Sequence, residues 1–439
     1  MKDPNGLKMN IEVICRKISS RQAHIAITGL GYVGLPLGIE FAKSGFHVTG
    51  IDINIERIKS LKKGQSYILD VTDKDIQSCT QLGKFKATED FSDLGKSDVI
   101  IICVPTPLSK TREPDVSAII AVGEQIAQNI KKGQVIILES TTYPGTTEEV
   151  ILPMLESRGG KVGLDFFLGF SPERIDPGSR HFSTKTIPKI VAGVTPRCTR
   201  LVQTVYEQVT EKVVVVSSTK VAEMAKLLEN TFRAVNIALV NEVALMCNKL
   251  KIDVWEVIDA AATKPFGFMP FYPGPGLGGH CLPIDPLYLA WKAKLHGFQS
   301  RFIELASQVN SFMPDYVIER VTAALNERSK PVKGSKLLAI GVAYKKNVND
   351  IRESPALDII NMLIANGASV TFYDPYIFNL DSIQRGELTP EVLRSQDAVL
   401  LITDHDQLNY DVIFQNSALI IDTRNAFRNY RDSSKVIRI

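Results

Sequence analysis

Gly29-Leu30-Gly31-Tyr32-Val33-Gly34 follows directly on an apolar, β-rich run, His24–Thr28, and leads into an apolar pattern of helical period that extends through Phe41. A strand, this glycine spacing and a helix in that order are typical of a dinucleotide-binding βαβ unit. The first glycine makes the tight turn, the second lets a pyrophosphate approach the backbone, and the third lets the helix pack on the strand. The stretch therefore predicts a Rossmann-like α/β domain.

The next predicted strand indicates which dinucleotide is bound. His47–Ile51 is apolar and ends in Asp52, which lies about 20 residues past the glycines, the usual place of the acid that contacts the ribose. A carboxylate there accepts hydrogen bonds from the ribose hydroxyls and repels a 2′-phosphate, so NAD is favoured over NADP. Arg57, on the following segment, either lies over the adenine side of NAD or is a solvated helix residue.

Length and charge narrow the class of protein. The 439 residues exceed one ordinary domain, and at about 150 residues per domain two to three are expected. With 44% hydrophobic residues the chain can bury a large core, and its formal charge of +3 is spread without a dense Lys/Arg run. This distribution favours small-molecule partners over nucleic acid.

The six cysteines are widely spaced and contain no Cys-x-x-Cys pair, so no metal site and no disulfide framework is expected, in keeping with a reducing cytoplasm. Residues 1–21 are too polar for a signal peptide or a membrane span, and a loose tail with one helical turn is predicted there.

Polar side chains follow three further predicted strands, Asp98–Val104, Gln134–Glu139 and Asp165–Phe170. Because ligands bind outside the carboxyl ends of parallel strands, the hydroxyls at these ends are expected near the cofactor or a reacting hydroxyl, ordinary turn and N-cap chemistry being the alternative; they are Thr106, Ser140, Thr141 and Thr142. Glu173, after the last strand, is either an acid/base or a surface ion-pair partner of Arg174.

A helical period begins at Ser217 or Ser218 and continues to about Leu250, with apolar residues on more than one face. Such a helix is buried on several sides and links two domains or two subunits. Lys226 and Asn230 are neighbours on one face of it. An ammonium and an amide together suit an oxyanion, while a snorkelling lysine and an interhelical hydrogen bond form the alternative.

The stretch Gly274–Asp285 contains four glycines that allow positive φ and close approach to a ligand. It delivers Cys281, and Asp285 before Pro286 opens a helix as its cap. Cys281 is a candidate covalent nucleophile, the alternative being an inert small residue in a turn. The preceding Thr263–Pro273 is rich in aromatic residues, Pro and Gly and is predicted to be a fixed binding loop.

After helices over about 286–296 and 301–328 and a short linker, a second α/β unit is predicted from the strands Lys336–Gly341, Ser369–Tyr373, Ala398–Ile402 and Ala418–Ile421 and the helix Ser354–Asn366. It lacks the glycine fingerprint, and instead Lys345, Arg352 and Arg424 place positive charge near strand ends. This unit is interpreted as a nucleotide-sugar half-site. The domains expected are a tail (1–21), an NAD-binding domain (22–216), a central helical domain with the cysteine loop (217–328) and a UDP-sugar domain (329–439).

Over residues 22 to 435 the chain resembles the UDP-glucose/GDP-mannose dehydrogenase family, and Pro265–Asp285 is similar to its bacterial branch that acts on UDP-N-acetylhexosamines, in particular the UDP-N-acetylglucosamine 6-dehydrogenases. His280 stands where UDP-glucose enzymes commonly have Ser, and it either tunes the thiol or packs in the loop. The resemblance implies two Rossmann-like domains joined by a long central helix, usually a dimer through that helix, and NAD-dependent four-electron oxidation of the sugar C6 alcohol to a carboxylate for a surface polymer such as capsule or O-antigen.

The resemblance also implies individual roles. Cys281 would be the nucleophile, Lys226 and Asn230 the oxyanion group, Asp285 and Glu173 the acid/base carboxylates, and Thr142 would lie near the catalytic water. Cofactor positions are Gly29, Gly31, Tyr32, Val33, Gly34, Asp52, Arg57, Thr106, Thr142 and Arg352. Substrate positions are Glu173, Lys226, Asn230, Phe271, Tyr272, Gly274, Gly276, Gly278, Lys345 and Arg424.

Three alternatives stay open from the sequence. The sugar could be that of UDP-glucose or UDP-N-acetylmannosamine. A two-electron dehydrogenase of the hydroxyacid type shares the helix Lys and Asn but has no use for Cys281. A non-catalytic NAD-binding scaffold would keep the fold without turnover.

Overall fold

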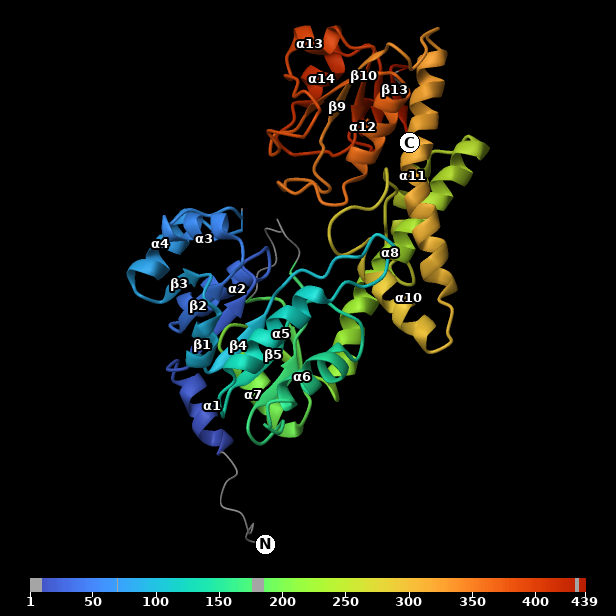
Figure 1. The fold of residues 1–439 in the computed structure, drawn as a ribbon. Helices are drawn as coiled ribbons and strands as arrows, with labels where there is room; N and C mark the ends of the chain where they lie inside the picture. Colours follow the sequence, from blue (N-terminus) through green and yellow to red (C-terminus); the bar gives the residue numbers. More distant parts are fainter. Residues whose placement is uncertain (1–9, 69, 176–184, 431–433) are drawn as a thin grey trace. The chain divides into compact units, whose positions relative to one another are not determined.

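The structure is a computed structural model that describes residues 10–68, 70–175, 185–430 and 434–439. It forms two compact units (Figure 1). The first contains the chain up to Glu229 together with Leu287–Gly297, and the second contains Asn230–Pro286 and Phe298–Ile439. Over the described residues the first unit carries an eight-stranded sheet and the second a five-stranded sheet.

The sheet of the first unit has the order β3-β2-β1-β4-β5-β6-β7-β8. All its neighbouring strands are parallel except β6 and β7, which run antiparallel. The strands β4, β5 and β6 are fully buried runs of apolar residues, as expected for a sheet covered on both faces. The strands are β1 (His24–Thr28), β2 (His47–Ile51), β3 (Phe85–Thr88), β4 (Val99–Ile102), β5 (Val135–Leu138), β6 (Phe167–Phe170), β7 (Lys189–Gly193) and β8 (Val213–Val215).

Helices cover both faces of this sheet, and the alternation of side chains along each strand divides the core in two. Ile25 and Ile27 of β1 face one core, while Ala26 faces the other. The first core is closed by α1 (Ile11–Ser19), α2 (Gly34–Lys43), α3 (Ile55–Lys62), α4 (Asp73–Gln81) and α7 (Pro196–Tyr206). The second is closed by η1 (Phe91–Lys96), α5 (Ser117–Asn129), η2 (Thr147–Ile151) and α6 (Leu152–Glu156).

The N-terminal segment corrects one expectation. The loose tail with one helical turn is predicted for residues 1–21, of which 1–9 lie outside the described residues. Ile11–Ser19 forms the nine-residue helix α1, longer than the single turn predicted, and it packs on α7. Asn10 caps it, and Cys15 and Ile18 are buried in the first core. The apolar residues of α1 recur at helical spacing, so the helix buries a face as soon as α7 is beside it.

The second unit has a parallel sheet of order β10-β9-β11-β12-β13, again with a separate core on each face. Its strands are β9 (Lys336–Ile340), β10 (Ser369–Tyr373), β11 (Ala398–Leu401), β12 (Ile420–Asp422) and β13 (Val436–Arg438). Its helices include α9 (Val254–Ala262), α11 (Arg301–Asn326), α12 (Pro355–Ala365), α13 (Pro390–Arg394), α14 (Tyr410–Asn416) and the short η3 (Arg428–Tyr430), while α10 (Asp285–Leu295) begins in this unit.

The long helix α8 (Thr219–Leu250) is continuous for 32 residues and crosses the boundary of the two units in the chain. The prediction of two Rossmann-like parallel-sheet units joined by a long helix is therefore confirmed, with the antiparallel pair β6–β7 as the exception within the first sheet. In the described part of the chain, none of the helices is long and apolar enough to cross a membrane.

Candidate active site

Each glycine of the fingerprint has its own structural reason. Gly29 has φ +88°, and a Cβ there would lie 2.4 Å from the carbonyl oxygen of Cys103. A Cβ on Gly34 would lie 1.9 Å from the carbonyl oxygen of Gly29, so helix α2 starts as close to the turn as backbone permits. A Cβ on Gly31 would meet nothing within 4 Å, which leaves open space at the position where a pyrophosphate would approach.

Asp52 directly follows β2, next to the glycine turn, and is 5% exposed. Its Oδ2 accepts from the backbone N–H of Leu30 at 2.8 Å and from Arg57 at 3.2 Å, and its Oδ1 accepts from the N–H of Asn54 at 2.8 Å. The Arg57 guanidinium lies 5.6 Å from the Tyr67 ring centre, and the Tyr67 hydroxyl donates to the Leu30 carbonyl at 2.6 Å. Asp52 thus braces the glycine turn, and Arg57 is its ion-pair partner. Tyr32 and Val33 are half-buried in the turn.

These features fit a dinucleotide. The turn leaves room beside Gly31, and an acidic residue stands at the end of β2, where a ribose would lie. The residues that would hold NAD are the glycine turn, Asp52 and the hydroxyls at the ends of β4 and β5.

Two of those hydroxyls are already engaged. Ser140 donates to the carbonyl of Val104 at 2.8 Å, which is the turn chemistry given as its alternative. Thr142 lies 2.7 Å from the Thr146 hydroxyl and is 1% exposed. Thr106 is also buried, at 4% exposure, and Thr141 is half-buried.

Glu223 of α8, which the sequence reasoning missed, holds the loop that carries Thr142. Its carboxylate accepts from the N–H of Gly145 at 2.5 Å and from the N–H and hydroxyl of Thr147 at 3.0 and 2.7 Å. Burial raises the pKa of Glu223 to about 7, against an ordinary value of 4.5. In the sequence, Glu223 could have been noticed as an acidic residue on a largely apolar face of the predicted helix.

This raised pKa predicts a pH dependence of stability. A carboxyl whose pKa is higher in the folded state stabilises fully below its unfolded pKa, and the contribution is lost as pH rises from about 4.5 to about 7. The urea midpoint of the first unit should therefore fall as pH rises from 5 to 8, and this fall should be smaller in Glu223→Gln. The substitution should remove roughly 1–3 kcal/mol of the change in unfolding free energy over that range. Trp291 lies in the first unit and Trp255 in the second, so a Trp255→Phe background reports the first unit alone. An unchanged slope in Glu223→Gln would contradict the assignment.

Glu173 is not in a surface ion pair with Arg174. Arg174 instead pairs with Glu229 at 2.6 Å, and Glu173 is buried. The Glu173 Oε1 accepts from the N–H groups of Arg174 and Ile175 at 2.6 Å each, and Oε2 accepts from Lys189 at 2.9 Å.

Lys189 also donates to Glu139, which accepts from the Tyr206 hydroxyl as well. The sequence reasoning missed Glu139, Lys189 and Tyr206. Burial raises the pKa of Glu139 to about 8. Burial alone would raise the pKa of Glu173 too, but the Lys189 ammonium, together with hydrogen bonds to Lys189, Glu139 and the Ile175 N–H, outweighs burial and lowers that pKa to about 2. Glu173 is therefore ionised at neutral pH and can accept a hydrogen bond, but it cannot act as an acid.

In the second unit, the cysteine loop is a tight turn. The Cys281 carbonyl accepts from the N–H groups of Ile284 and Asp285 at 3.2 and 2.9 Å, and α10 begins at Asp285. Cys281 is half-buried, whereas the other five cysteines are buried. His280 is half-buried, and this burial lowers its pKa and so favours the neutral imidazole.

The glycines of the cysteine loop are required for two different structural reasons. Gly276 and Gly279 have φ of +132° and +82°, as expected, and the Gly279 N–H donates to the Arg352 carbonyl at 3.0 Å. Gly274 and Gly278 do not have positive φ, which corrects the prediction for them. They are glycines for lack of space, because a Cβ would lie 2.7 Å from the Arg424 guanidinium at Gly274 and 2.7 Å from the Tyr344 Cβ at Gly278.

Asn230 and Asp285 meet within the second unit. The Asn230 amide donates to the Asp285 carboxylate, and its oxygen accepts from Arg233, a residue that the sequence reasoning missed. Asn230 and Asp285 are 1% and 2% exposed. Lys226 precedes Asn230 by one turn of α8 and is buried at 7% exposure.

The aromatic loop before the cysteine is anchored on the helices of its own unit. Phe271 packs edge-on against Phe232, and Tyr272 stacks on Trp255 and donates to Asp259 at 2.9 Å. The Gly274 N–H donates to the Asn241 amide oxygen at 2.9 Å, and Asn241 donates to Asn310. These contacts anchor the end of the loop at Phe271–Gly274, whereas residues 263–270 are exposed, and a role of the loop in binding stays a prediction.

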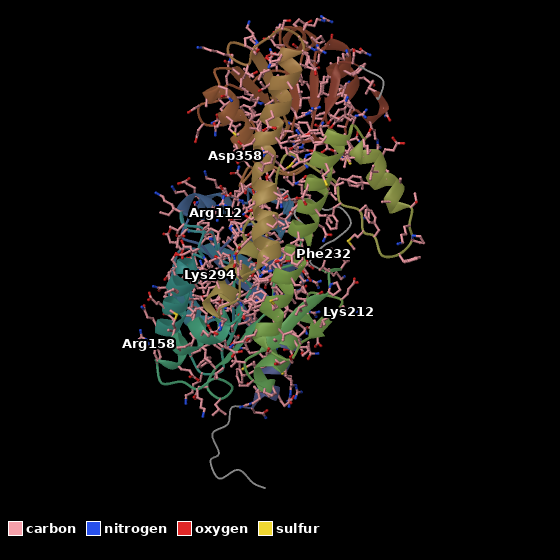
Figure 2. All side chains as sticks on the ribbon, turned by 90° about the vertical axis from the view of Figure 1, so that its right-hand side faces the viewer. Arg112, Arg158, Lys212, Phe232, Lys294 and Asp358 are labelled. Carbon is pink, nitrogen blue, oxygen red and sulfur yellow. The ribbon has the colours of Figure 1, made fainter. Side chains whose placement is uncertain are left out.

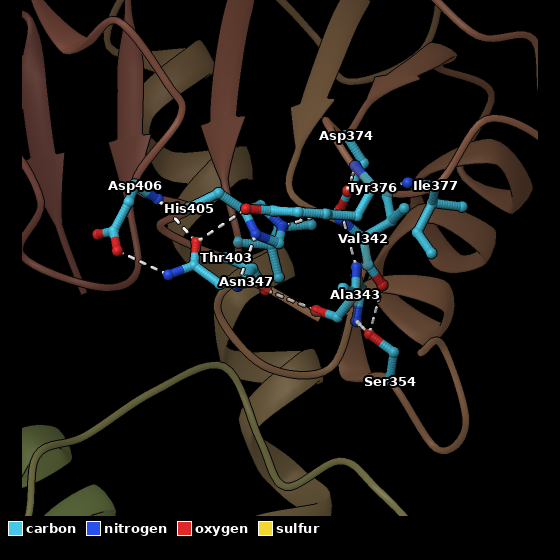
Figure 3. A network of polar contacts seen from close by, with 12 residues as sticks. Val342, Ala343, Asn347, Ser354, Asp374, Tyr376, Ile377, Thr403, His405 and Asp406 are labelled. Atoms are coloured by element: carbon cyan, nitrogen blue, oxygen red, sulfur yellow. Dashed lines mark hydrogen bonds and ion pairs between the residues drawn. The ribbon is translucent and has the colours of Figure 1, made fainter. Parts of the chain in front are cut away.

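Asp374 at the end of β10 occupies the place in the second unit that Asp52 has in the first. Its carboxylate accepts from four backbone N–H groups, those of Val342, Ala343, Tyr376 and Ile377, at 2.7 to 3.1 Å (Figure 3). His405 Nδ1 accepts from the Asn347 N–H, so Nε2 carries the proton and donates to Asp374 at 3.0 Å. Asp374 is fully buried and bonded on both oxygens, so it cannot serve a ribose.

The three cationic candidates of the second unit have distinct settings. Arg352 forms a close ion pair with Asp350 at 2.7 Å. Arg424 donates from Nε to the Ile402 carbonyl at 2.8 Å and lies against Gly274, while Lys345 is half-buried in the loop after Ala343. Arg424 thus joins the glycine loop, whereas Arg352 reaches it through its backbone carbonyl.

Comparison with protein-family models agrees with a dinucleotide site in the first unit. The UDP-glucose/GDP-mannose dehydrogenase family is matched over all three of its parts: the NAD binding domain at residues 23–210, the central domain at 220–312 and the UDP binding domain at 338–429. The chain belongs to this family. It is an NAD-dependent nucleotide-sugar dehydrogenase, as the resemblance and the predicted cofactor indicated.

Individual relatives are similar along nearly their whole length. The UDP-N-acetyl-D-glucosamine 6-dehydrogenase of Pseudomonas aeruginosa is 38% identical over 87% of this chain and 90% of its own. The UDP-N-acetyl-D-mannosamine dehydrogenase of Pyrococcus horikoshii is 35% identical over 92% of this chain and 96% of its own. A solved structure of the UDP-D-ManNAc dehydrogenase from Pyrococcus horikoshii superposes with a TM-score of 0.86 at 34% identity, covering 95% of this chain and 99% of that one.

Proposed function

We propose that the chain oxidises the C6 alcohol of a UDP-N-acetylhexosamine, foremost UDP-N-acetylglucosamine, to the uronic acid through a covalent bond to Cys281. The carrying observation is the half-buried thiol in a glycine turn that leads straight into Asp285, itself held by Asn230. The 38% and 36% identical UDP-N-acetyl-D-glucosamine 6-dehydrogenases of Pseudomonas aeruginosa and Salmonella typhi support this sugar. UDP-N-acetylmannosamine is the second candidate, supported by the relative from Pyrococcus horikoshii.

The residues divide the chemistry between them. NAD, when bound, accepts the hydrides. Cys281 attacks the C6 aldehyde and holds it as a thiohemiacetal and then as a thioester, which water hydrolyses. Lys226 and Asn230 donate to the oxyanions of the tetrahedral species. The ionised Glu173 accepts from the hydrolytic water beside Thr142, and Asp285 takes the alcohol proton.

The remaining candidates hold the two nucleotides. Gly31, Tyr32, Val33, Asp52 and Thr106 contact NAD, with Arg57 steadying Asp52 and Arg352 contributing charge. On the substrate side, Lys345 and Arg424 neutralise the diphosphate. The Phe271–Gly278 segment contacts the sugar nucleotide, because its backbone is fixed by Asn241 and its rings by Phe232 and Trp255.

The stoichiometry of NADH tests this function. Purified protein should form two NADH per sugar when limiting UDP-N-acetylglucosamine is run to completion, and UDP-N-acetylmannosamine, UDP-N-acetylgalactosamine and UDP-glucose are compared under the same conditions. One NADH per sugar would favour a two-electron dehydrogenase and demote Cys281. No turnover of any of the four would favour the NAD-binding scaffold.

The cofactor assignment predicts the effect of removing Asp52. Asp52→Ala should raise the KM for NAD about tenfold to a hundredfold and the KM for the sugar much less, because a hydrogen bond to a charged group is lost together with the brace on the Leu30 N–H. Steady-state kinetics with each substrate varied measures this. Glu56→Ala is the matched control, since Glu56 is exposed and pairs with Lys59. Equal changes in both KM values would argue that Asp52 does not hold the ribose.

The exposed face of α8 supports a homodimer or higher homo-oligomer. Its exposed apolar side chains recur every three, four or seven residues on one stripe, opposite the buried Glu223, Asn230 and Asn241; they are Val221, Met224, Leu228, Phe232, Leu239, Met246 and Leu250. Phe232 is labelled in Figure 2. A stripe of this length is large for an exposed patch and fits the same helix of a second copy.

This oligomer predicts a mass change on substitution. Leu228→Lys with Leu239→Lys should convert the assembly to monomers in sedimentation equilibrium, because two charges would be buried without partners. Glu256→Lys on the exposed side of α9 is the control and should keep the assembly. Unchanged mass in the double variant would place the interface elsewhere.

The product is proposed to serve a surface polysaccharide, in line with the 39% identical Protein CapL of Staphylococcus aureus.

A further inference from the structure

The antiparallel pair β6–β7 places a lysine directly opposite Glu173. Phe170 of β6 pairs with Ala192 of β7, and Glu173 lies three residues after Phe170 just as Lys189 lies three residues before Ala192. The extended register therefore brings these two side chains together, and the Lys189 Nζ lies 2.9 Å from the Glu173 Oε2. A parallel β7 would have put Lys189 at the other edge of the sheet.

Lys189 is a bridge rather than one half of a simple pair. It also donates to Glu139 at the end of β5, and the Tyr206 hydroxyl at the end of α7 donates to the other oxygen of Glu139. The Lys189 ammonium lies 5.2 Å from the centre of the Tyr206 ring. All four side chains are buried, with Lys189, Glu139 and Tyr206 exposed by 4%, 1% and 1%.

The charges of this cluster do not balance if both carboxyls are ionised. Two carboxylates and one ammonium would leave a net negative charge away from water, which is costly. A proton on Glu139 makes the cluster neutral, and burial favours that proton because it raises the Glu139 pKa to about 8. Among the described residues, the other titratable group that faces the cluster is Cys103 at the end of β4, whose pKa burial raises, so the thiol stays neutral.

Glu173 is the member of the cluster that is fixed in direction. Its Oε1 is held by two backbone N–H groups and its Oε2 by Lys189, so the carboxylate has one orientation. Charged hydrogen bonds of this kind favour the ionised form of the acceptor.

We propose that Lys189 is a positioning residue for the dehydrogenase reaction: it holds Glu173 ionised and aimed, while a proton on Glu139 keeps the buried cluster neutral. The proposal rests on the proposed function, in which Glu173 accepts from the hydrolytic water. Neither Lys189 nor Glu139 contacts substrate in it, and both act through Glu173.

Lys189→Met tests the role of the ammonium in turnover, because it keeps the length of the side chain and removes its charge. Its kcat at pH 6 should fall about a hundredfold, the scale of general-base catalysis, with the KM for NAD and for the UDP-sugar changed less than about threefold. Because a buried carboxyl without its cation has a raised pKa, activity should recover as pH rises from 6 to 9. Lys189→Arg retains the charge and should restore the flat acid side of the profile.

A matched surface control separates this effect from a general loss of lysine charge. Lys212 at the start of β8 has an exposed side chain (Figure 2), and Lys212→Met should behave as the wild type. If Lys189→Met is folded and keeps the pH profile of the wild type, the positioning role is overturned. A Lys189→Arg protein that is folded but has the profile of Lys189→Met would also overturn it.

An infrared readout tests the same proposal without turnover, so its failure and that of the proposed function are distinguishable. In spectra at pH 6, the wild type should show a protonated-carboxyl band that is lost in Glu139→Gln and kept in Glu173→Gln. Lys189→Met should gain a further band of this kind, beyond those of Glu139 and of Glu223, that is lost on adding Glu173→Gln. Absence of that gain overturns the proposal even in an active enzyme, whereas inactivity of the wild type on every UDP-sugar with these bands present overturns only the proposed function.

If Lys189→Met does not fold, Tyr206→Phe decides instead. It removes the hydroxyl that donates to Glu139 and keeps the buried ring. The proposal expects its protonated-carboxyl band to shift while the kcat falls less than tenfold. An unshifted band would overturn the assignment of the proton to Glu139.

Discussion

Cys281→Ser should abolish uronate release, lowering kcat by at least roughly a thousandfold, while NAD binding should stay nearly intact. A serine hydroxyl in the same turn is not ionised near neutral pH, so it cannot replace the thiolate as a nucleophile. The loop itself should stay intact, because the turn depends on the Cys281 carbonyl and on glycines rather than on the sulfur. Fluorescence titration of NAD and a product assay for the uronate measure the two effects separately.

The control for this prediction is Cys247→Ser. Cys247 is buried in α8 of the same unit, and its loss should leave turnover within about threefold of the wild type, because it only packs there. Full uronate release by Cys281→Ser would remove the thioester route and return the protein to the class of two-electron dehydrogenases.

Asp374→Ala should destabilise the second unit by about 3–5 kcal/mol and weaken UDP-sugar binding with it. The substitution leaves four backbone N–H groups and the His405 Nε2 without their acceptor in a fully buried place. It also releases Asn347, whose N–H is held by His405, and so loosens the loop that carries Lys345. Urea unfolding in a Trp291→Phe background, in which Trp255 reports the second unit, measures the loss.

Asp358→Asn on α12 serves as its control. Asp358 is exposed (labelled in Figure 2), and desolvation of its carboxyl raises its pKa, so a neutral amide should be tolerated within about 0.5 kcal/mol. A wild-type unfolding midpoint for Asp374→Ala would show that the Asp374 network does not hold the second unit together.

Several features of the fold could be predicted from the sequence because their causes are local. The glycine turn depends on positive φ at Gly29 and on the lack of a Cβ at Gly34, and both requirements lie within a few residues. The buried strands and α8 follow from runs and periods of apolar residues. The family could be recognised because its motifs combine over most of the chain.

Other features could not be predicted because they depend on which strands become neighbours. A buried strand has the same apolar pattern whether it runs parallel or antiparallel, so nothing local showed that β7 reverses and brings Lys189 to Glu173. For the same reason the sequence could not exclude the alternative of an ion pair between Glu173 and Arg174, and Arg174 instead contacts Glu229. The clamp of Glu223 on the Thr142 loop joins residues more than seventy positions apart.

The sequence by itself determined the class of fold, the cofactor and the family, because each of these rests on short motifs whose steric and charge requirements are local. Only the tertiary structure decided how the buried charges are used. In the structure, Asp374 accepts hydrogen bonds from four backbone N–H groups and from His405, and Asn230 donates to Asp285. Lys189 donates to Glu173 and keeps it ionised. The physical reason is that the state of a buried carboxyl depends on its burial and on the donors that the fold brings to it, and these come from distant parts of the chain.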